Sequence, residues 1–115
     1  MLHNSKLFSF DAGAQVGSGG DVYWHQYPTP TVRTLDPKGK AQLANMGVID
    51  FDSVTYEQLL GLSYSTTPLD GNDDSTNQLA TGDVFAVLTN DGNHAKVKVL
   101  GYGYDLKLRW VTYKG

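Results

Sequence analysis

Five aromatic residues in two short stretches are the part of this sequence best suited to holding a ligand. Tyr23, Trp24 and Tyr27 precede a pair of prolines, and Tyr102 and Tyr104 lie in a glycine-rich turn. Flat rings can stack against the apolar C–H faces of a sugar, and exposed Tyr and Trp also make good contacts with proteins. These residues therefore predict a surface for a glycan or a protein partner. Its hydrogen-bonding groups are expected from four polar residues, namely Asn90, Asp91, Asn93 and Asp105.

A place in the hydrophobic core is the alternative for any aromatic residue of a small β domain. Trp110 shares its strand phase with Leu106 and Leu108, so we expect it in the core. Trp24 fits either interpretation. It lies between Tyr23 and Tyr27 in the sequence, which favours a place on the binding surface, but large aromatics are mostly buried. The turn tyrosines are the most favourable for exposure.

An acidic loop offers oxygen ligands for a cation. Asp70, Asn72 and Asp74 occupy positions one, three and five of a loop resembling a calcium site. The pattern then departs from that site, since Ser75 replaces the glycine at position six and Thr81 the glutamate at position twelve. The alternative is a solvated loop in which Asp and Asn cap their own backbone.

A row of cations near the C-terminus is the third candidate surface. Lys96 and Lys98 alternate with apolar residues, as do Lys107 and Arg109, so we expect all four on the wet face of a sheet. Such a face could receive phosphates. The net charge of −3 and the absence of an RNA-binding motif make nucleic acid an unfavourable partner.

Catalytic patterns are weak in this chain. The three histidines have no metal-ligand spacing, and no cysteine is present to act as a nucleophile or a zinc ligand. A glycosidase would need two carboxyl groups that converge in space, which spacing alone does not indicate. We therefore expect a protein that is not an enzyme and carries no cofactor. The carboxyl groups that could serve the enzymatic alternative are Asp50, Asp52, Asp83 and Asp105.

The composition indicates which elements position these residues. The chain has 115 residues, 40% of them hydrophobic, which suits one domain spanning residues 1–115. Of its 12 acidic residues, 11 are Asp and only Glu57 is Glu. Because Asp favours turns and caps, this imbalance predicts strands joined by many turns. No apolar run is long enough to span a membrane.

Three strand-like runs at residues 83–89, 94–100 and 106–113, joined by short turns, predict an antiparallel meander. Further strands are expected at 6–10, 21–27 and 48–51, and an edge strand at 29–35. A capping box beginning at Thr55 predicts a two-turn helix that ends at Gly61, and Pro37 could open a helical turn that ends at Gly47. The predicted fold is mainly β: a small antiparallel barrel or sandwich with a C-terminal three-stranded meander and one or two short helices.

The meander also carries a resemblance. The segments GDVFAV (82–87), AKVKV (95–99) and LRWVTY (108–113) resemble uncharacterised β-rich accessory modules of bacterial extracellular proteins. Phe51, Asp52 and Ser53, with Leu59 and Tyr64, extend it to about half of the chain. The resemblance implies an extracellular or cell-surface location, as part of a longer chain. Together with the aromatics it favours a non-catalytic binding module, with a structural or adhesive spacer as the alternative and a small Asp-based glycosidase as the third possibility.

Overall fold

The computed structural model describes residues 2, 6–27, 32–72, 74–103 and 105–114. In these residues nine strands form two antiparallel sheets. The five-stranded sheet has the order β2-β1-β3-β4-β6, formed by β1 (Leu7–Ser9), β2 (Ala14–Val16), β3 (Val22–Gln26), β4 (Arg33–Pro37) and β6 (Leu69–Asp70). The four-stranded sheet has the order β5-β7-β8-β9, formed by β5 (Gln42–Val48), β7 (Asp83–Leu88), β8 (His94–Gly101) and β9 (Lys107–Tyr113).

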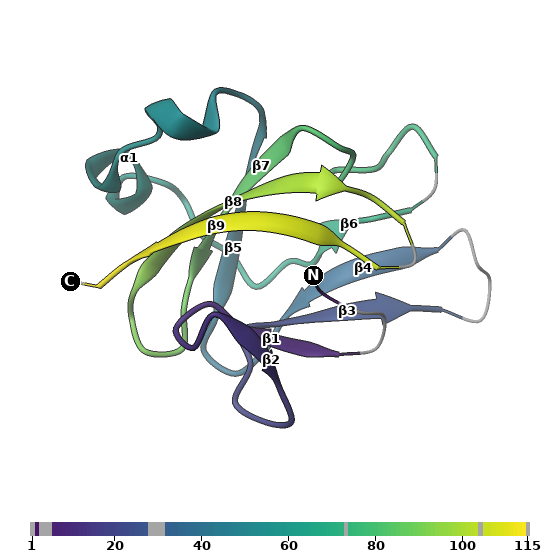
Figure 1. Cartoon of the computed structure of the whole chain (residues 1–115), viewed down its shortest axis with the longest axis horizontal. Helices are drawn as coiled ribbons and strands as arrows, with labels where there is room; N and C mark the ends of the chain where they lie inside the picture. The colour runs from purple at the N-terminus through teal and green to yellow at the C-terminus, as the bar shows by residue number, and fades with distance from the viewer. Residues whose placement is uncertain (1, 3–5, 28–31, 73, 104, 115) are drawn as a thin grey trace.

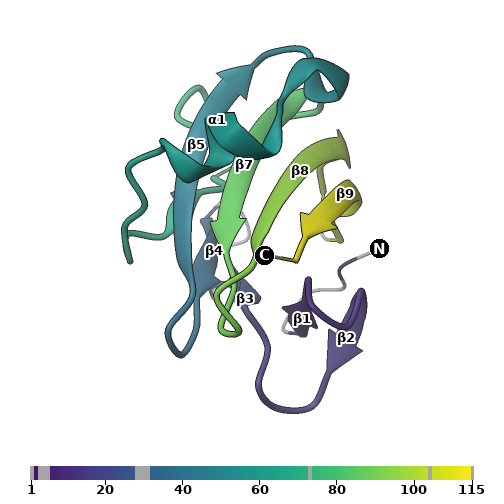
Figure 2. The same ribbon diagram turned by 90° about the vertical axis from the view of Figure 1, so that its left-hand side faces the viewer.

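The two sheets pack face to face as a sandwich (Figure 1), and the second view shows them as two layers (Figure 2). A single core cluster joins them, with Trp24 and Leu35 from one sheet and Phe85 and Val97 from the other. Each fully buried side chain of this size contributes about 1.5–3 kcal/mol of hydrophobic stabilisation. Of the two predicted architectures, the sandwich is confirmed, since the sheets do not close into a barrel.

The predicted C-terminal meander is confirmed. β8 lies between β7 and β9, and its central residue Val97 pairs with Phe85 on one side and Trp110 on the other. Alternate residues of β8 face the core, where Ala95, Val97 and Val99 are fully buried. The period of two in the sequence was therefore enough to predict both the strands and their inner face.

The predicted helix at the capping box is also confirmed. α1 (Tyr56–Leu60) begins after Thr55, whose Oγ1 accepts a hydrogen bond from the backbone N–H of Gln58 at 3.2 Å. In return, the Gln58 side chain accepts one from the Thr55 N–H at 2.8 Å, and Gly61 caps the other end. Immediately before it, the short 3-10 helix η1 (Phe51–Ser53) is capped by Asp50. Among the described residues, no helix has the length and apolar character to cross a membrane.

The prediction of a helical turn between Pro37 and Gly47 is wrong, because these residues contain strand β5. Leu43 packs in the main core cluster, whereas its neighbour Ala44 packs in a second cluster under α1. Adjacent residues facing opposite sides require an extended chain. Gly47 has a φ of 74° beside an irregularity in the pairing with β7, so it accommodates a bulge rather than a helix cap.

Two expected strands also differ. β4 is not an edge strand, because β6 pairs with its outer side through Thr34 and Leu35. The expected strand at 48–51 does not form, since Val48 ends β5 and Phe51 begins η1. The sequence did not reveal β6, which is two residues long and surrounded by loop.

The prediction of a fully wet basic face is wrong at Lys96. This side chain is buried, and its Nζ donates hydrogen bonds to the carbonyls of Phe51 at 2.8 Å and Val54 at 3.0 Å. The ammonium also lies 4.5 Å from the centre of the Phe51 ring. Lys96 therefore fixes η1 to the outer face of the four-stranded sheet, whereas Lys107 and Arg109 remain exposed.

Candidate functional site

Three aromatic rings follow one another along the outer face of the five-stranded sheet. Tyr23 and His25 on β3, and Tyr27 directly after it, alternate with the buried Val22 and Trp24, and so point away from the core. The ring centres of Tyr23 and His25 are 5.7 Å apart, and those of His25 and Tyr27 are 4.1 Å apart and nearly parallel. We call Tyr23, His25 and Tyr27 the aromatic strip. Tyr27 and the His25 side chain are 39% and 37% exposed, so a ligand can reach the rings.

The neighbouring strand β4 holds the middle ring in place. The Nδ1 of His25 lies 3.3 Å from Oδ2 of Asp36, and because a carboxylate can only accept, Nδ1 is the donor in this contact. The other oxygen of Asp36 accepts a hydrogen bond from Thr34 Oγ1 at 2.6 Å. These contacts restrict the imidazole rotation before any ligand arrives. The pairing of His25 with Thr34 and of Tyr23 with Asp36 places all these groups on the same face.

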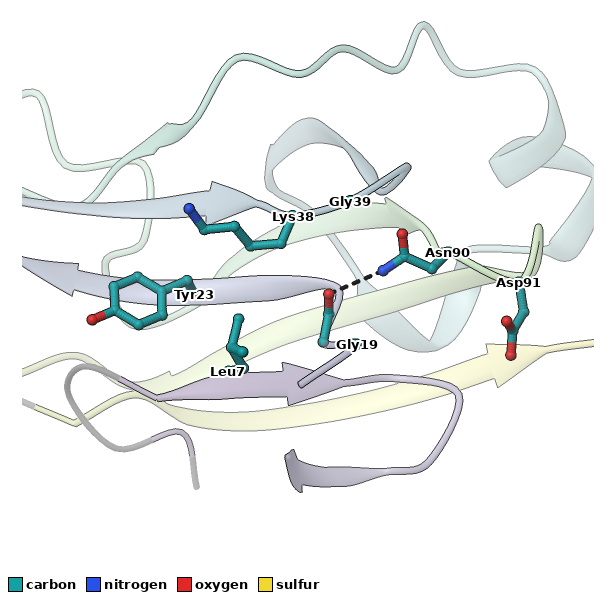
Figure 3. Close-up of a pocket in the computed structure, with 8 residues that line it drawn as sticks. Leu7, Gly19, Tyr23, Lys38, Gly39, Asn90 and Asp91 are labelled. Atoms are coloured by element: carbon teal, nitrogen blue, oxygen red, sulfur yellow. Dashed lines mark hydrogen bonds between the residues drawn. The ribbon is translucent and has the colours of Figure 1, made fainter. Parts of the chain in front are cut away.

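A pocket of about 590 Å³ adjoins the Tyr23 end of the aromatic strip. Figure 3 shows Tyr23 and Lys38 at one end of it and Asp91 at the other. The Lys38 ammonium lies 5.5 Å from the centre of the Tyr23 ring. The full lining is Leu7, Gly19, Gly20, Tyr23, Lys38, Gly39, Asn90 and Asp91.

The wall of the pocket is fixed by Asn90, in the turn between β7 and β8. Its Nδ2 donates to the carbonyl of Gly20 at 2.9 Å (Figure 3) and to Oδ1 of Asp21 at 3.1 Å. Its Oδ1 accepts a hydrogen bond from the backbone N–H of Lys40 at 2.6 Å. Gly39 is required beside it, because a Cβ there would lie 2.5 Å from Asn90 Oδ1 and the φ of Gly39 is +64°. Asn90 is therefore a structural part of the wall.

Asp21 lies behind this wall and is fully buried. Burial raises the pKa of its carboxyl group above the usual value, although hydrogen bonds from the backbone of Asn90 and Phe10 act in the opposite direction. Its Oδ1 accepts from the Asn90 N–H and its Oδ2 from the Phe10 N–H, both at 2.8 Å. Because protein groups occupy both oxygens, we assign Asp21 a structural role.

Trp24 is not part of this surface, which corrects the prediction that it stacks on a ligand. Its side chain is fully buried, because its position on β3 faces the opposite sheet. The indole fits directly against Gly71, where an added Cβ would lie 2.6 Å from the ring. Trp24 is therefore a core residue, the alternative that its sequence context left open.

Tyr102 also has a structural position. Its hydroxyl donates to the carbonyl of Gly71 and accepts from Nη1 of Arg33 at 3.0 Å, and its ring packs edge-on to Trp24. This half-buried residue connects the turn after β8 to β4 and to the chain after β6. It does not join the aromatic strip, and Tyr104 lies outside the described residues.

Among the polar residues predicted to assist the aromatics, two line the pocket with Tyr23: Asn90 and Asp91. Asn93 is in the same turn but donates its Nδ2 to Asp11 at 2.8 Å, and Asp105 belongs to the turn after β8. Sequence reasoning gave no role to His25 or Lys38. The alternation along β3 was the signal for His25, whereas Lys38 reaches Tyr23 only through the β3–β4 pairing.

The side-chain oxygens of the acidic loop accept hydrogen bonds from backbone N–H groups. Asp70 Oδ1 accepts from the Asn72 N–H at 2.8 Å, and Asn72 Oδ1 from the Arg33 N–H at 3.0 Å. Asp74 Oδ1 accepts from both the N–H and the hydroxyl of Thr76, which lowers the pKa of Asp74. Asp73 lies outside the described residues, and within those that are described no three His, Asp or Glu side chains could hold a metal ion together. The geometry therefore favours the self-capped loop.

Three of the four carboxyl groups considered for glycoside hydrolysis are engaged in structural contacts. Asp50 caps η1 and accepts from the Ser53 hydroxyl at 2.6 Å, which lowers the pKa of its carboxyl, whereas a general acid needs a raised one. Asp52 pairs with Arg109 at 3.2 Å, and Asp83 is buried and accepts from the Ala80 N–H. None of these contacts indicates a catalytic pair.

A second depression lies between the end of β5 and α1, with a volume of about 490 Å³. Its lining includes the apolar residues Met46, Ile49, Val54 and Leu62. Val48, beside it in the sequence, is 79% exposed. This second depression has no aromatic ring in its lining.

No family model matches this chain, and neither does any curated protein or solved structure. The function of the site is therefore argued from its own geometry.

Proposed function

We propose that this protein is a non-catalytic binding module that takes a glycan on the aromatic strip and in the adjoining pocket. The observation that carries this proposal is the row formed by Tyr23, His25 and Tyr27 on an outer sheet face, ending in a pocket of about 590 Å³. Sugar rings present apolar C–H faces between rings of hydroxyl groups. A row of partly exposed rings flanked by polar side chains is complementary to such a chain of sugar units.

Preorganisation supports the proposal. The stack of His25 on Tyr27 and the contact of His25 with Asp36 hold two of the rings before binding. Ordering a free side chain at an interface costs about 0.5–1.5 kcal/mol, so rings that are already ordered bind more favourably. Tyr also combines a rigid apolar face with a polar hydroxyl, which suits a ligand with both kinds of surface.

We further propose the setting implied by the resemblance: an accessory module of a bacterial extracellular or cell-surface protein, within a longer chain. The segments that carry the resemblance form β7, β8 and β9, in the sheet opposite the aromatic strip. A module of this kind would keep one sheet as a common framework and use the other to hold its ligand.

The test is affinity electrophoresis of the purified protein through gels that contain a broad panel of polysaccharides. We expect at least one polysaccharide to retard the wild type, and Tyr23→Ala and Tyr27→Ala each to weaken retardation at least about fivefold, since truncating an anchoring aromatic costs more than about 1 kcal/mol. The matched control is Tyr56→Ala, a half-buried tyrosine of α1 near the opposite sheet. No retardation by any polysaccharide, or equal retardation of all variants, would overturn the proposal.

The alternative function is a spacer that docks on another protein domain, and a different observation favours it. Val48, Ile49 and Leu60 are exposed around the second depression, and large exposed apolar groups often mark contact surfaces. If docking through the surface around the second depression is the function, Val48→Asp should abolish co-purification with the partner domain, whereas Tyr27→Ala should leave it intact. Intact co-purification of Val48→Asp would contradict this alternative.

A further inference from the structure

The polar groups that line the pocket differ in their capacity to contact a ligand. The Asn90 side chain is already hydrogen-bonded to Gly20, Asp21 and the backbone of Lys40, so it has little remaining capacity to hydrogen-bond a ligand. Lys38 and Asp91 are exposed side chains at opposite ends of the pocket (Figure 3). A ligand that enters the pocket therefore finds a cation at one end and an anion at the other.

The cation is at the Tyr23 end, where the proposed ligand stacks. Lys38 Nζ lies 5.5 Å from the Tyr23 ring centre, and among the described residues no carboxylate forms an ion pair with it. Lys38 directly follows β4, whose one carboxylate is that of Asp36. Its two oxygens are already bonded to Thr34 and His25. The ammonium of Lys38 is thus available to an incoming anion.

We infer that the glycan is an acidic one, with a uronate carboxylate bound by Lys38 while its sugar ring lies against Tyr23. This inference rests on the proposed function and names the class of its ligand. A hydrogen bond between an ammonium and a carboxylate is roughly twice as strong as one between neutral groups. Lys38 therefore binds a uronate more tightly than a neutral sugar. Asp91 repels a carboxylate from the opposite end, and this repulsion sets the direction in which the ligand lies.

The experiment compares matched pairs of oligosaccharides by isothermal titration calorimetry. Oligogalacturonate, oligomannuronate and hyaluronan oligosaccharides are each tested beside the same oligosaccharide after chemical reduction of its carboxyl groups to alcohols. The protein variants are Lys38→Gln and Lys40→Gln. Lys40 is an exposed cation two residues away that does not line the pocket, so it is the matched control for general charge attraction.

We expect at least one uronate to bind about three- to tenfold more tightly than its reduced form. Lys38→Gln should remove this preference and Lys40→Gln should keep it. Equal binding of acidic and reduced forms would overturn the inference, as would an equal loss of the preference in both variants. Binding of reduced but not acidic oligosaccharides would overturn it while leaving the proposed function standing. If no polysaccharide in the broader gel panel binds, the proposed function fails, and the inference with it.

Discussion

Asn90 donates two hydrogen bonds to the same carboxylate oxygen of the buried Asp21, from its backbone N–H at 2.8 Å and from its side-chain Nδ2 at 3.1 Å. The two residues are 69 positions apart in the chain. One precedes β3 and the other follows β7, so the contact ties the five-stranded sheet to the four-stranded sheet. It also fixes the wall of the pocket beside Tyr23.

Asp21→Asn should lower the free energy of unfolding by about 1–3 kcal/mol at pH 7. An amide has only one acceptor oxygen, and its NH2 group is a donor. Either the Phe10 N–H or the two Asn90 donors would therefore face this NH2 group instead of an oxygen. Urea unfolding measures the loss. Asp91→Asn, at an exposed acid of the same pocket, should change stability by less than about 0.5 kcal/mol, and an equal effect of the two would contradict this account.

The same substitution should change the pH dependence of stability. Burial raises the pKa of Asp21 above its usual value of 3.8, so the folded state binds this proton more tightly than the unfolded state. The resulting stabilisation is complete below pH 3.8 and is lost as pH rises through the folded pKa. The difference in stability between wild type and Asp21→Asn should therefore fall as pH rises from about 3.8, and a difference that grows with pH would contradict the assignment.

Gly71→Ala should disrupt the core around Trp24. The new Cβ would lie 2.6 Å from the indole ring, and overpacking of this kind costs about 1–3 kcal/mol. Thermal unfolding and the near-UV circular dichroism of the tryptophans would report it. Gly17→Ala, where nothing lies within 4 Å of the new methyl group, should leave both signals unchanged.

Lys96→Met should loosen η1 from the sheet. The variant keeps most of the apolar length of the side chain but removes the donor to the carbonyls of Phe51 and Val54, at a cost of about 1–3 kcal/mol. Hydrogen exchange should accelerate at residues 51–60 more than in β7 or β8. Lys107→Met, at an exposed position of the same sheet, is the control. Equal exchange rates at residues 51–60 in the two variants would show that Lys96 does not hold this segment.

Tyr64 should make the protein sensitive to alkaline pH. Burial raises the pKa of its hydroxyl to about 12, and the hydroxyl donates to the Leu59 carbonyl at 2.7 Å. The folded state therefore holds this proton more tightly, and the stability it contributes below pH 10 is lost as pH rises towards 12. Tyr64→Phe should flatten that decline, measured as the urea midpoint against pH. Tyr27→Phe should not, and an unchanged decline in Tyr64→Phe would contradict this role.

The sequence was sufficient for the parts of the fold governed by local rules. Alternation along residues 94–100 predicted β8 and its buried face, and the pairing of Thr55 with Gln58 predicted the start of α1. It was insufficient where distant contacts decide. Leu43 and Ala44 suit a helix locally, yet they form a strand because each has a different cluster to pack against.

The site divides in the same way. Tyr23, Asn90 and Asp91 were recognised by residue type, but their convergence depends on the contact between Asp21 and Asn90, which no short-range pattern contains. Trp24 and Tyr23 are adjacent in sequence, and only the phase of β3 places one in the core and the other on the surface. Composition alone does not say which residues of β3 face the core. The alternation of buried and partly exposed residues along the strand shows it.

The central claim is that a glycan binds on the outer face of the five-stranded sheet, and amide chemical-shift mapping by NMR tests it most directly. The isotope-labelled protein would be titrated with oligosaccharides of any polysaccharide that retards it in gels. We predict that the shifts change at residues 23–27, 34–36, 38 and 90–91 and remain constant in β9 and α1. Changes confined to β9, α1 or the second depression, or no change with any oligosaccharide, would contradict the account.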